Sequence, residues 1–483
     1  MTAQYAFHFD ATSCSGCKAC QVACKDKNNL PTGVLWRRVY EVSGGEWTQV
    51  GEAWPNTVFA YNLSMACNHC VHPKCAGVCP VDAYTVREDG IVYLDTAKCI
   101  GCGYCAWACP YAAPQYNPEA GYMSKCDFCC DNLDAGLPPA CVAACPLRVL
   151  DFVTVNDGQM VVDGQTPLWE VPGTEHPFPL PRYSHTEPHL AIKSHAGMLN
   201  HLKKTISNRE EIQPRKVSAW EEAPLMAFTL LSQMAVGGFW VMQWMFPPLW
   251  SVFEYDTTYL RFLPSLLVGL CLGAGMLVSF AHLGTKRNAW RVLAHLRKSW
   301  LSREILFTGL FGTGWLVATM AGFFWLQASS ALTWLTALLG LGLIHSMSQV
   351  YRLPSVPTWD TWRTNANFLL SSLLLGLLGM ACVLAFESQI TGIVISSWRW
   401  GQIGMGTLVL LASQLALDST YSSRVAATRL RYGLILAGLF GAAAIFFIPA
   451  LTGFWTSLLI FLLVLVEEGV GRWSFYQARE AGL

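Results

Sequence analysis

The distribution of hydrophobic positions divides this chain into two halves of different character. From residue 224 onward, long apolar runs alternate with short polar joints. Most of these runs reach about 20 residues, the length at which a helix crosses a bilayer. The runs lie at 224–246, 262–283, 304–326, 331–350, 366–386, 401–417, 432–450 and 453–471. The pattern predicts a multi-pass protein of the lipid bilayer, in which residues 223–475 form an all-α eight-helix transmembrane bundle.

The first half has a finer pattern. Short strand-like segments, such as YAFHFD at 5–10 and IVYLD at 91–95, precede groups of cysteines. This arrangement is typical of small α+β domains of the double ferredoxin-like type, so we predict a four-cluster [4Fe–4S] domain over residues 1–150. Residues 151–222 are rich in proline, histidine and charge and have neither the strand nor the helix period. We expect them to form an extended wrap and then a linker.

The cysteine spacing carries the strongest chemical signal. Residues 99–110, CIGCGYCAWACP, follow the pattern C-x₂-C-x₂-C-x₃-C-P. In that run three thiolates bind one [4Fe–4S] cluster and the fourth binds another. Three further groups repeat the pattern, two of them with longer gaps. The sixteen candidate metal ligands are Cys14, Cys17, Cys20, Cys24, Cys67, Cys70, Cys75, Cys79, Cys99, Cys102, Cys105, Cys109, Cys126, Cys129, Cys141 and Cys145.

Two other uses of cysteine fit less well. A disulfide framework is common in secreted scaffolds, but C-x₂-C-x₂-C gathers thiols around a common metal centre. Zinc also binds paired C-x₂-C motifs, yet its sites rarely use four cysteines within eleven residues. Cys130, next to Cys129, is left over, and we expect it to be a bystander.

Net charge and the motifs that are missing exclude several classes of function. The 32 basic and 32 acidic residues give a net charge of zero, which offers no hint of a nucleic-acid partner. The chain has no P-loop, no GxGxxG after a strand and no C-x-x-C-H haem motif. We therefore predict no catalytic residues for group transfer. The chain is expected to be an electron carrier joined to a membrane domain, where a quinone or quinol is the natural redox partner.

The motifs RRVYE, CNHC, KCIGCGYCAWACPY and CPLRVLDF resemble the iron–sulfur subunit of the dimethyl sulfoxide reductase family, within the molybdopterin oxidoreductase superfamily. This resemblance covers residues 1 to about 190. Residues 220–478, with HLGTKRNAW, VPTWDTW and GRWSFY, look like that family's eight-helix membrane anchor. The resemblance implies a large catalytic subunit that holds the molybdopterin cofactor, with this chain passing electrons between it and the membrane quinone pool. In the familiar arrangement the two parts are separate polypeptides.

The resemblance also implies how the cysteines pair. The groups of three in sequence would each take the last cysteine of another group, giving the sets Cys14–Cys17–Cys20–Cys145, Cys24–Cys126–Cys129–Cys141, Cys67–Cys70–Cys75–Cys109 and Cys79–Cys99–Cys102–Cys105. The set with Cys102 would lie nearest the membrane and the set with Cys14 nearest the catalytic subunit. Some relatives have Trp at the place of Cys102 and a three-iron cluster; Cys here implies four irons.

Quinol oxidation releases protons, so the quinone site needs a titratable side chain near the membrane surface. Ionisable residues within membrane helices are costly and often functional. His282, Glu304 and His345 stand at helix ends predicted on the side of the N-terminal domain. We expect His282 and Glu304 to exchange the proton and His345 to be structural. The alternative for the first two is purely electrostatic, because a histidine at a helix C-terminus and a glutamate at a helix N-terminus both interact favourably with the helix dipole. Glu467, Glu468 and Arg472 are interpreted as a surface salt-bridge group, and Gly269 and Gly273 as a close helix contact.

Other functions stay open at this point. A self-sufficient ferredoxin:quinone oxidoreductase would use the same motifs without a catalytic partner. A redox-sensing transporter would require broken or charged helices at mid-membrane, which the runs lack. A haem-bearing anchor would use His282 and His345 as axial ligands.

The basic residues predict the orientation, because basic short loops stay in the cytoplasm. The loops after the second, fourth and sixth runs and the linker before the first are basic, whereas the opposite loops hold little beyond Arg261 and Arg399. The basic set is Lys203, Lys204, Arg209, Arg215, Lys216, Lys286, Arg287, Arg291, Arg297, Lys298, Arg303, Arg352, Arg363, Arg424, Arg429 and Arg431. We expect the N-terminal domain on the cytoplasmic face of the inner membrane; the resemblance makes the periplasmic face the alternative.

The ligand count makes a direct prediction. The purified chain should hold about sixteen iron atoms, four for each complete ligand group. Replacing Cys102 by Ser should convert only the membrane-proximal cluster to a three-iron form, visible by electron paramagnetic resonance in the oxidised state. An unchanged spectrum would remove Cys102 from the ligand set.

Overall fold

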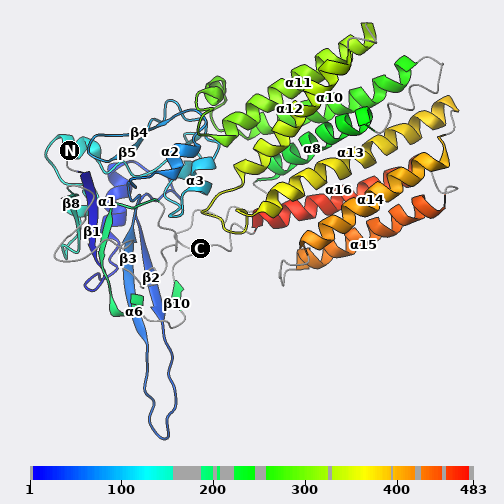
Figure 1. The fold of residues 1–483 in the computed structure, drawn as a ribbon. Coiled ribbons are helices and arrows are strands. Elements are labelled where there is room, and N and C mark those ends of the chain that lie inside the picture. The colour runs from blue at the N-terminus through cyan, green and yellow to red at the C-terminus, as the bar shows by residue number, and fades with distance from the viewer. Residues whose placement is uncertain are drawn as a thin grey trace.

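The computed structural model describes residues 4–155, 186–199, 204–206, 222–244, 257–324, 329–392, 395–418, 426–448 and 453–477. Much of the predicted wrap and linker, residues 156–185 and 207–221, lies outside these described residues, as do Lys203 and Arg424 of the basic set. Two parts are evident in Figure 1: an N-terminal domain, residues 4–206, and a helical bundle, residues 223–477.

Small sheets and short helices make up the N-terminal domain. Its strands are β1 (Gln4–Asp10), β2 (Arg38–Gly44), β3 (Phe59–Met65), β4 (Tyr84–Val86), β5 (Val92–Leu94), β6 (Gln115–Asn117), β7 (Tyr122–Ser124), β8 (Leu150–Val155), β9 (Leu190–Lys193) and β10 (Lys204–Ile206). Its helices are α1 (Ala19–Lys27), α2 (Lys74–Val78), α3 (Tyr104–Ala108), α4 (Cys130–Asp134), α5 (Ala140–Ala143) and α6 (Ala196–Leu199). The strands form sheets in the orders β8-β1-β9, β10-β2-β3, β4-β5 and β6-β7.

The segment predicted as an extended wrap contributes strands to both larger sheets. β8 runs antiparallel to β1, while β9 runs parallel to it, with Phe7 opposite Leu190. β10 pairs with β2 on the other sheet. Leu190, Ala191 and Ile192 are buried, so this segment adds to the hydrophobic core.

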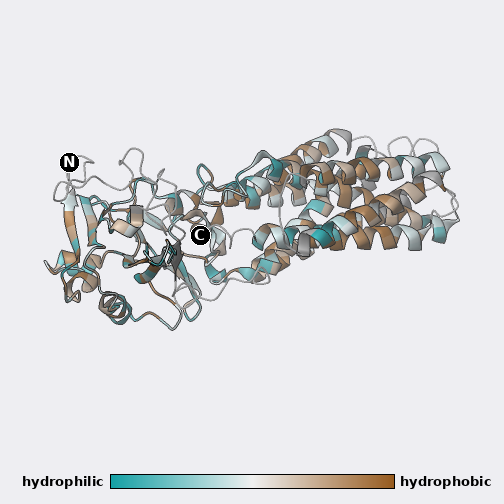
Figure 2. Ribbon diagram, turned by 90° about the horizontal axis from the view of Figure 1, so that it is seen from below, coloured by the Kyte–Doolittle hydropathy of each residue, from teal (hydrophilic) through white to brown (hydrophobic). Residues whose placement is uncertain are grey.

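The bundle consists of eight long helices within the described residues. They are α8 (Ala223–Trp244), α10 (Thr257–His282), α11 (Trp300–Phe324), α12 (Ser329–Val350), α13 (Trp362–Thr391), α14 (Ser397–Asp418), α15 (Ala426–Phe447) and α16 (Phe454–Gln477). Seven of them, all except α15, are identified as long and apolar enough to cross a membrane. α15 packs against α14 and α16. Figure 2 shows apolar residues concentrated along the bundle and a mixed pattern in the N-terminal domain.

α8 contacts α10, α12, α13 and α16. It meets α13 through two glycines: a Cβ on Gly376 would lie 2.1 Å from the backbone carbon of Gly237. The expected contact at Gly269 and Gly273 is only half correct. Gly269 lies against the Trp315 ring, but a Cβ on Gly273 would meet nothing within 4 Å. The spacing identified a pair of small residues, whereas packing depends on which helix faces them.

The loop after α10 clamps the N-terminal domain to the bundle. Thr285 donates its backbone N–H to the Ile100 carbonyl at 3.0 Å, and Asn288 donates to the Cys99 carbonyl at 3.0 Å. Gly284 lies so close that a Cβ on it would come within 2.1 Å of the Gly121 carbonyl oxygen. This close approach requires glycine at position 284.

The start of α11 adds a second set of contacts to the cysteine loops. His295, Ser299 and Ser302 hydrogen-bond to the carbonyls of Cys79, Val78 and Pro80 at 2.8, 2.7 and 3.2 Å. The α10–α11 region therefore fixes the carbonyls of cysteine-bearing loops. The bundle and the N-terminal domain are therefore in direct contact at this interface.

The glycine contact between α8 and α13 generates a prediction. Gly376→Ala should destabilise the bundle by about 1–3 kcal/mol, because the added methyl group overpacks a backbone contact. Gly273→Ala is the matched control and should be neutral or slightly stabilising, since alanine favours a helix over glycine. Thermal unfolding of the detergent-solubilised chain measures both. Equal midpoints for the two variants would contradict the packing role of Gly376.

Candidate metal centres and membrane site

The cysteines at the two ends of the N-terminal sequence meet in space. Cys14, Cys17, Cys20 and Cys145 line one cavity, together with Ser64 and other residues of that region. Cys17 is exposed, whereas the other three are partly or fully buried. We call these four residues the distal set. Residues far apart in sequence are brought together because β8, which follows Cys145, pairs with β1, which precedes Cys14.

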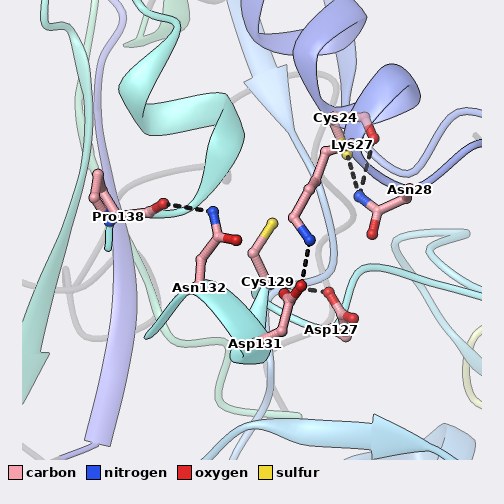
Figure 3. Close-up of polar contacts among 8 residues, drawn as sticks. All are labelled: Cys24, Lys27, Asn28, Asp127, Cys129, Asp131, Asn132 and Pro138. Atoms are coloured by element: carbon pink, nitrogen blue, oxygen red, sulfur yellow. Dashed lines mark hydrogen bonds and ion pairs between the residues drawn. The ribbon is translucent and has the colours of Figure 1, made fainter. Parts of the chain in front are cut away.

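Cys67, Cys70, Cys75 and Cys109 line another cavity, together with Lys125. We call these four cysteines the third set. Two more groupings follow from the electrostatic interactions between thiols. Cys102 and Cys105 interact with Cys79 and Cys99, which makes the membrane set. Cys24 interacts with Cys141 and Cys129, and Cys126 with Cys24 and Cys141, which makes the second set. Figure 3 shows Cys24 near the end of α1 and Cys129 at the start of α4.

Four short helices connect neighbouring sets, and they explain the x₃ gap in the motif. α1 carries Cys20 and Cys24, and α2 carries Cys75 with Cys79 at its end. Residues four apart lie on the same side of a helix, one turn from each other. The two cysteines therefore reach different sets across a single turn. Cys105 with Cys109 and Cys141 with Cys145 repeat this arrangement at α3 and α5.

The cysteine environment fits iron–sulfur clusters. The backbone N–H groups of Gly101 and Met123 both point to the Cys99 sulfur at 3.4 Å, as expected around a charged sulfur. Burial raises the pKa of the Cys102 thiol to about 12 and that of Cys109 to about 11. These thiols become thiolates at neutral pH only when a metal replaces the proton. No three His, Cys, Asp or Glu residues of the described chain are placed to hold a single metal ion.

The membrane set touches the bundle. Cys102 packs against the bundle's hydrophobic core, and Tyr104, which lies between Cys102 and Cys105 in sequence, belongs to that core. The Tyr104 hydroxyl donates to the Val350 carbonyl at the end of α12, at 2.9 Å. In Figure 1, α3 lies on the side of the N-terminal domain that faces the bundle, while α1 lies farther away.

Glu304 stands beside this contact. It lies in the second turn of α11 and is only 3% exposed. Burial raises the pKa of Tyr104 well above its ordinary value, and electrostatic interactions with Glu304, Tyr351 and Cys102 raise it further. Tyr104 therefore interacts electrostatically with Glu304, the predicted proton acceptor, and with Cys102, a member of the membrane set. Sequence reasoning identified Glu304 but not Tyr104, although Tyr104 stands inside the CGYC motif.

Aromatic side chains enclose the same region. Trp107 lies 6.1 Å from Tyr351 and 5.8 Å from Trp359 between ring centroids. The Tyr351 and Tyr476 hydroxyls are 2.5 Å apart, and Ser355 donates to the Trp107 carbonyl at 2.5 Å. The structure thus joins α3 to the ends of α12 and α16 through an apolar, water-excluding contact. Sequence analysis missed this cluster because its members are up to 369 residues apart.

The two predicted histidines have different surroundings. His282 is half-buried at the end of α10, and the next residue, Leu283, packs against the core that contains Cys99 and Cys105. His345 is exposed and lies edge-on to Trp300, with ring centroids 5.7 Å apart. No hydrogen bond between His282 and Glu304 is found among the described residues.

The expectation of a surface salt-bridge group on α16 is wrong. Glu467, Glu468 and Arg472 are all buried. Glu468 accepts hydrogen bonds from Ser371 and Gln414 at 2.8 and 2.6 Å. Arg431 pairs with Glu467 at 2.7 Å and Arg472 donates to Gln233 at 2.8 Å. Position near a helix end suggested exposure, but α16 packs against α8, α13 and α15 at this level.

Comparison with known proteins places both parts. Residues 217–478 match the model of the DMSO reductase anchor subunit (DmsC), and residues 58–155 match that of a 4Fe-4S dicluster domain. The chain belongs to the DMSO reductase anchor subunit family. Its N-terminal part is similar to the B subunit of the anaerobic dimethyl sulfoxide reductase of Escherichia coli (strain K12), 45% identical over 197 residues, which are 41% of this chain and 92% of that protein.

Two further relatives support the same assignment. YnfG of Escherichia coli (strain K12), a probable anaerobic dimethyl sulfoxide reductase subunit, is 46% identical over 198 residues, 41% of this chain and 92% of that protein. The thiosulfate reductase electron transfer subunit PhsB of Salmonella typhi is 38% identical over 161 residues, 33% of this chain and 81% of that protein. The predicted family is confirmed. This chain is an electron-transfer and membrane-anchor subunit that combines an iron–sulfur part and an anchor part in one polypeptide, and a molybdopterin-containing catalytic subunit is its partner.

Proposed function

We propose that the chain carries electrons from a membrane quinol, through four [4Fe–4S] clusters, to the separate catalytic subunit. The sixteen predicted cysteines would hold the clusters in the distal, second, third and membrane sets. When bound, each cluster accepts and returns one electron. The iron–sulfur relatives favour this function over a self-sufficient ferredoxin:quinone oxidoreductase. Transfer toward the quinone would use the same path in reverse.

One observation carries the proposal: the membrane set packs into the bundle core beside a buried carboxylate. Cys102 and Tyr104 contact that core, and Glu304 acts electrostatically on Tyr104. An electron leaving a quinol at this place reaches the membrane set without crossing the N-terminal domain. At the other end, the exposed Cys17 puts the distal set at a surface where a partner could dock.

The chain's own side chains would manage the protons. Quinol oxidation releases two protons with its two electrons, and a buried carboxylate close to the quinol can accept a proton directly. Glu304 would act as this relay, and His282 at the end of α10 would exchange the proton with the aqueous side. The Trp107, Tyr351 and Trp359 rings would exclude water from the reaction site. Tyr104, held by the Val350 carbonyl, would orient the quinol headgroup.

The proton relay makes a kinetic prediction. Glu304→Gln should slow reduction of the clusters by a quinol analogue at least about 100-fold, the lower range for loss of a positioned base. His282→Ala should stop that reduction, while iron content and membrane insertion stay intact. Stopped-flow absorbance of membranes measures the rate, and reduction by dithionite checks that the clusters remain functional. His345→Ala is the matched control and should keep the wild-type rate. Normal quinol oxidation in the His282 variant would rule out His282 as an acceptor.

We also propose that the N-terminal domain faces the cytoplasm. The loops after α10 and α12 contact this domain, so their charges report its side. Arg352 is paired with Asp360 at 2.9 Å and Arg431 with Glu467. The 3₁₀ segment Lys286–Leu293 carries further positive charge, with an exposed Trp290 beside Arg291. Basic and tryptophan side chains together are typical of a membrane interface.

Sidedness is directly measurable. Protease added to sealed, right-side-out spheroplasts should leave residues 1–220 intact, because the membrane shields a cytoplasmic domain. The same protease should digest this domain after lysis. Digestion before lysis would place the domain on the periplasmic face instead.

A further inference from the structure

Three cations are buried in the described part of the N-terminal domain, and two of them, Arg37 and Lys125, lie between the cysteine sets. Arg37 is 2% exposed and Lys125 is 3% exposed. A fully buried cation is costly unless an opposite charge compensates it. Neither side chain forms an ion pair with a carboxylate among the described residues. Arg37 lies over the Phe7 ring, with its guanidinium carbon 4.4 Å from the ring centroid, and further compensation of both cations must come from other neighbouring groups.

Arg37 lies between the distal and second sets. One terminal nitrogen, Nη1, donates to the Ser64 hydroxyl at 3.2 Å, and that hydroxyl is 3.4 Å from the Cys20 sulfur of the distal set. The backbone N–H of Arg37 hydrogen-bonds to Cys24 of the second set. Nε and Nη2 are buried and have no hydrogen-bond partner among the described residues. A buried guanidinium with two nitrogens that lack hydrogen-bond partners suits an anionic neighbour, which a bound cluster would supply.

Lys125 lies between the second and third sets. It lines the cavity of the third set, and its ammonium donates to the Cys126 carbonyl at 2.7 Å and to the Val92 carbonyl. Its own neighbour in sequence, Cys126, is a member of the second set. The thiols that act electrostatically on Lys125 are those of Cys67, Cys75 and Cys126. For Arg37 they are those of Cys141, Cys20 and Cys126.

We infer that Arg37 and Lys125 are charge-compensating residues that raise the reduction potentials of the cluster sets on either side of them. This inference rests on the proposed four-cluster path. Each electron adds negative charge to a buried site, and a fixed cation in a low-dielectric interior lowers the free energy of that reduced state. Arg37 acts on the distal and second sets and Lys125 on the second and third sets. The second set is therefore flanked by both cations and the membrane set by neither.

Other charged side chains lie around these two cations. Asp127 is the acidic group that acts on Lys125, and its carboxylate accepts the Cys129 N–H at 2.9 Å. Arg38, the third buried cation, donates to the carbonyls of Tyr111 and Ala112 at 3.1 and 3.0 Å and acts electrostatically on Cys109 of the third set.

The test removes one charge at a time from the full chain in membranes, with its catalytic partner. Arg37→Gln should lower the one-electron reduction constant of the distal and second sets at least tenfold, which is a midpoint shift of about 59 mV. Lys125→Gln should do the same for the second and third sets. Redox titration followed by low-temperature electron paramagnetic resonance measures all four midpoints. The membrane set should stay unchanged in both variants, as an internal control.

Lys27→Gln is the matched control for loss of a positive charge near a ligand. Lys27 extends from α1 to Asp131 near Cys129, as Figure 3 shows, but it is partly exposed and already paired. In this variant the one-electron reduction constants of all four sets should remain within threefold of their wild-type values. Unchanged midpoints in both Arg37→Gln and Lys125→Gln would overturn the inference, as would an equal shift in the Lys27 control.

Two further outcomes are informative. If a neutral variant loses iron, Arg37→Lys and Lys125→Arg decide: wild-type midpoints in both support the role of charge, and a tenfold fall in either contradicts it. The iron content of the wild-type chain separates this inference from the proposed function. About sixteen irons with unchanged potentials in the variants would refute only the role of the two cations. Too few irons would refute the four-cluster path itself.

Discussion

Burial of cysteine thiols is the constraint on which the N-terminal domain depends. Ten of the seventeen cysteines of this domain are fully buried, where a domain of this size would ordinarily place aliphatic side chains. A buried thiolate is unfavourable without a metal, and a buried protonated thiol packs as a small apolar group. Among the described residues, the sheets have only two or three strands each, so they provide little core of their own. We therefore expect metal binding and folding to be coupled in this part of the chain.

That coupling explains why the bundle holds the cysteine loops by their backbones. Hydrogen bonds from Asn288, Ser299 and Ser302 go to carbonyl groups of the cysteine loops and leave the thiol sulfurs to the metal. Gly284 allows the loop after α10 to approach Gly121 closely. The residues that form this interface belong to the bundle and to the cysteine loops, not to the linker that joins the two parts. The covalent fusion therefore adds no contact here, but it keeps the two parts at a high effective concentration.

Buried polar groups appear in two places, and the same physical rule governs both. In the N-terminal domain, Arg37 and Lys125 lie among the sulfur atoms of the cysteine sets. In the bundle, Arg431 pairs with Glu467, while Glu468 is satisfied by Ser371 and Gln414. A charge can be buried only when an opposite charge or several hydrogen bonds compensate it. Each such group therefore indicates where its compensating partner must be.

The sequence alone determined the division into two parts, the family, the identity of the candidate ligands and the positions of the apolar helices. These follow from local information: cysteine spacing encodes the geometry of a common metal centre, and a run of about 20 apolar residues is long enough to cross a bilayer. The tertiary structure decided which residues meet. Tyr104, Trp107 and Tyr351 come together only because α3 packs on the ends of α12 and α16. Likewise, Glu467 and Arg472 are buried because neighbouring helices cover them, and Gly237, not Gly273, meets another helix through its backbone. Such contacts depend on which face of each element is covered, and one residue's neighbours in sequence do not specify that.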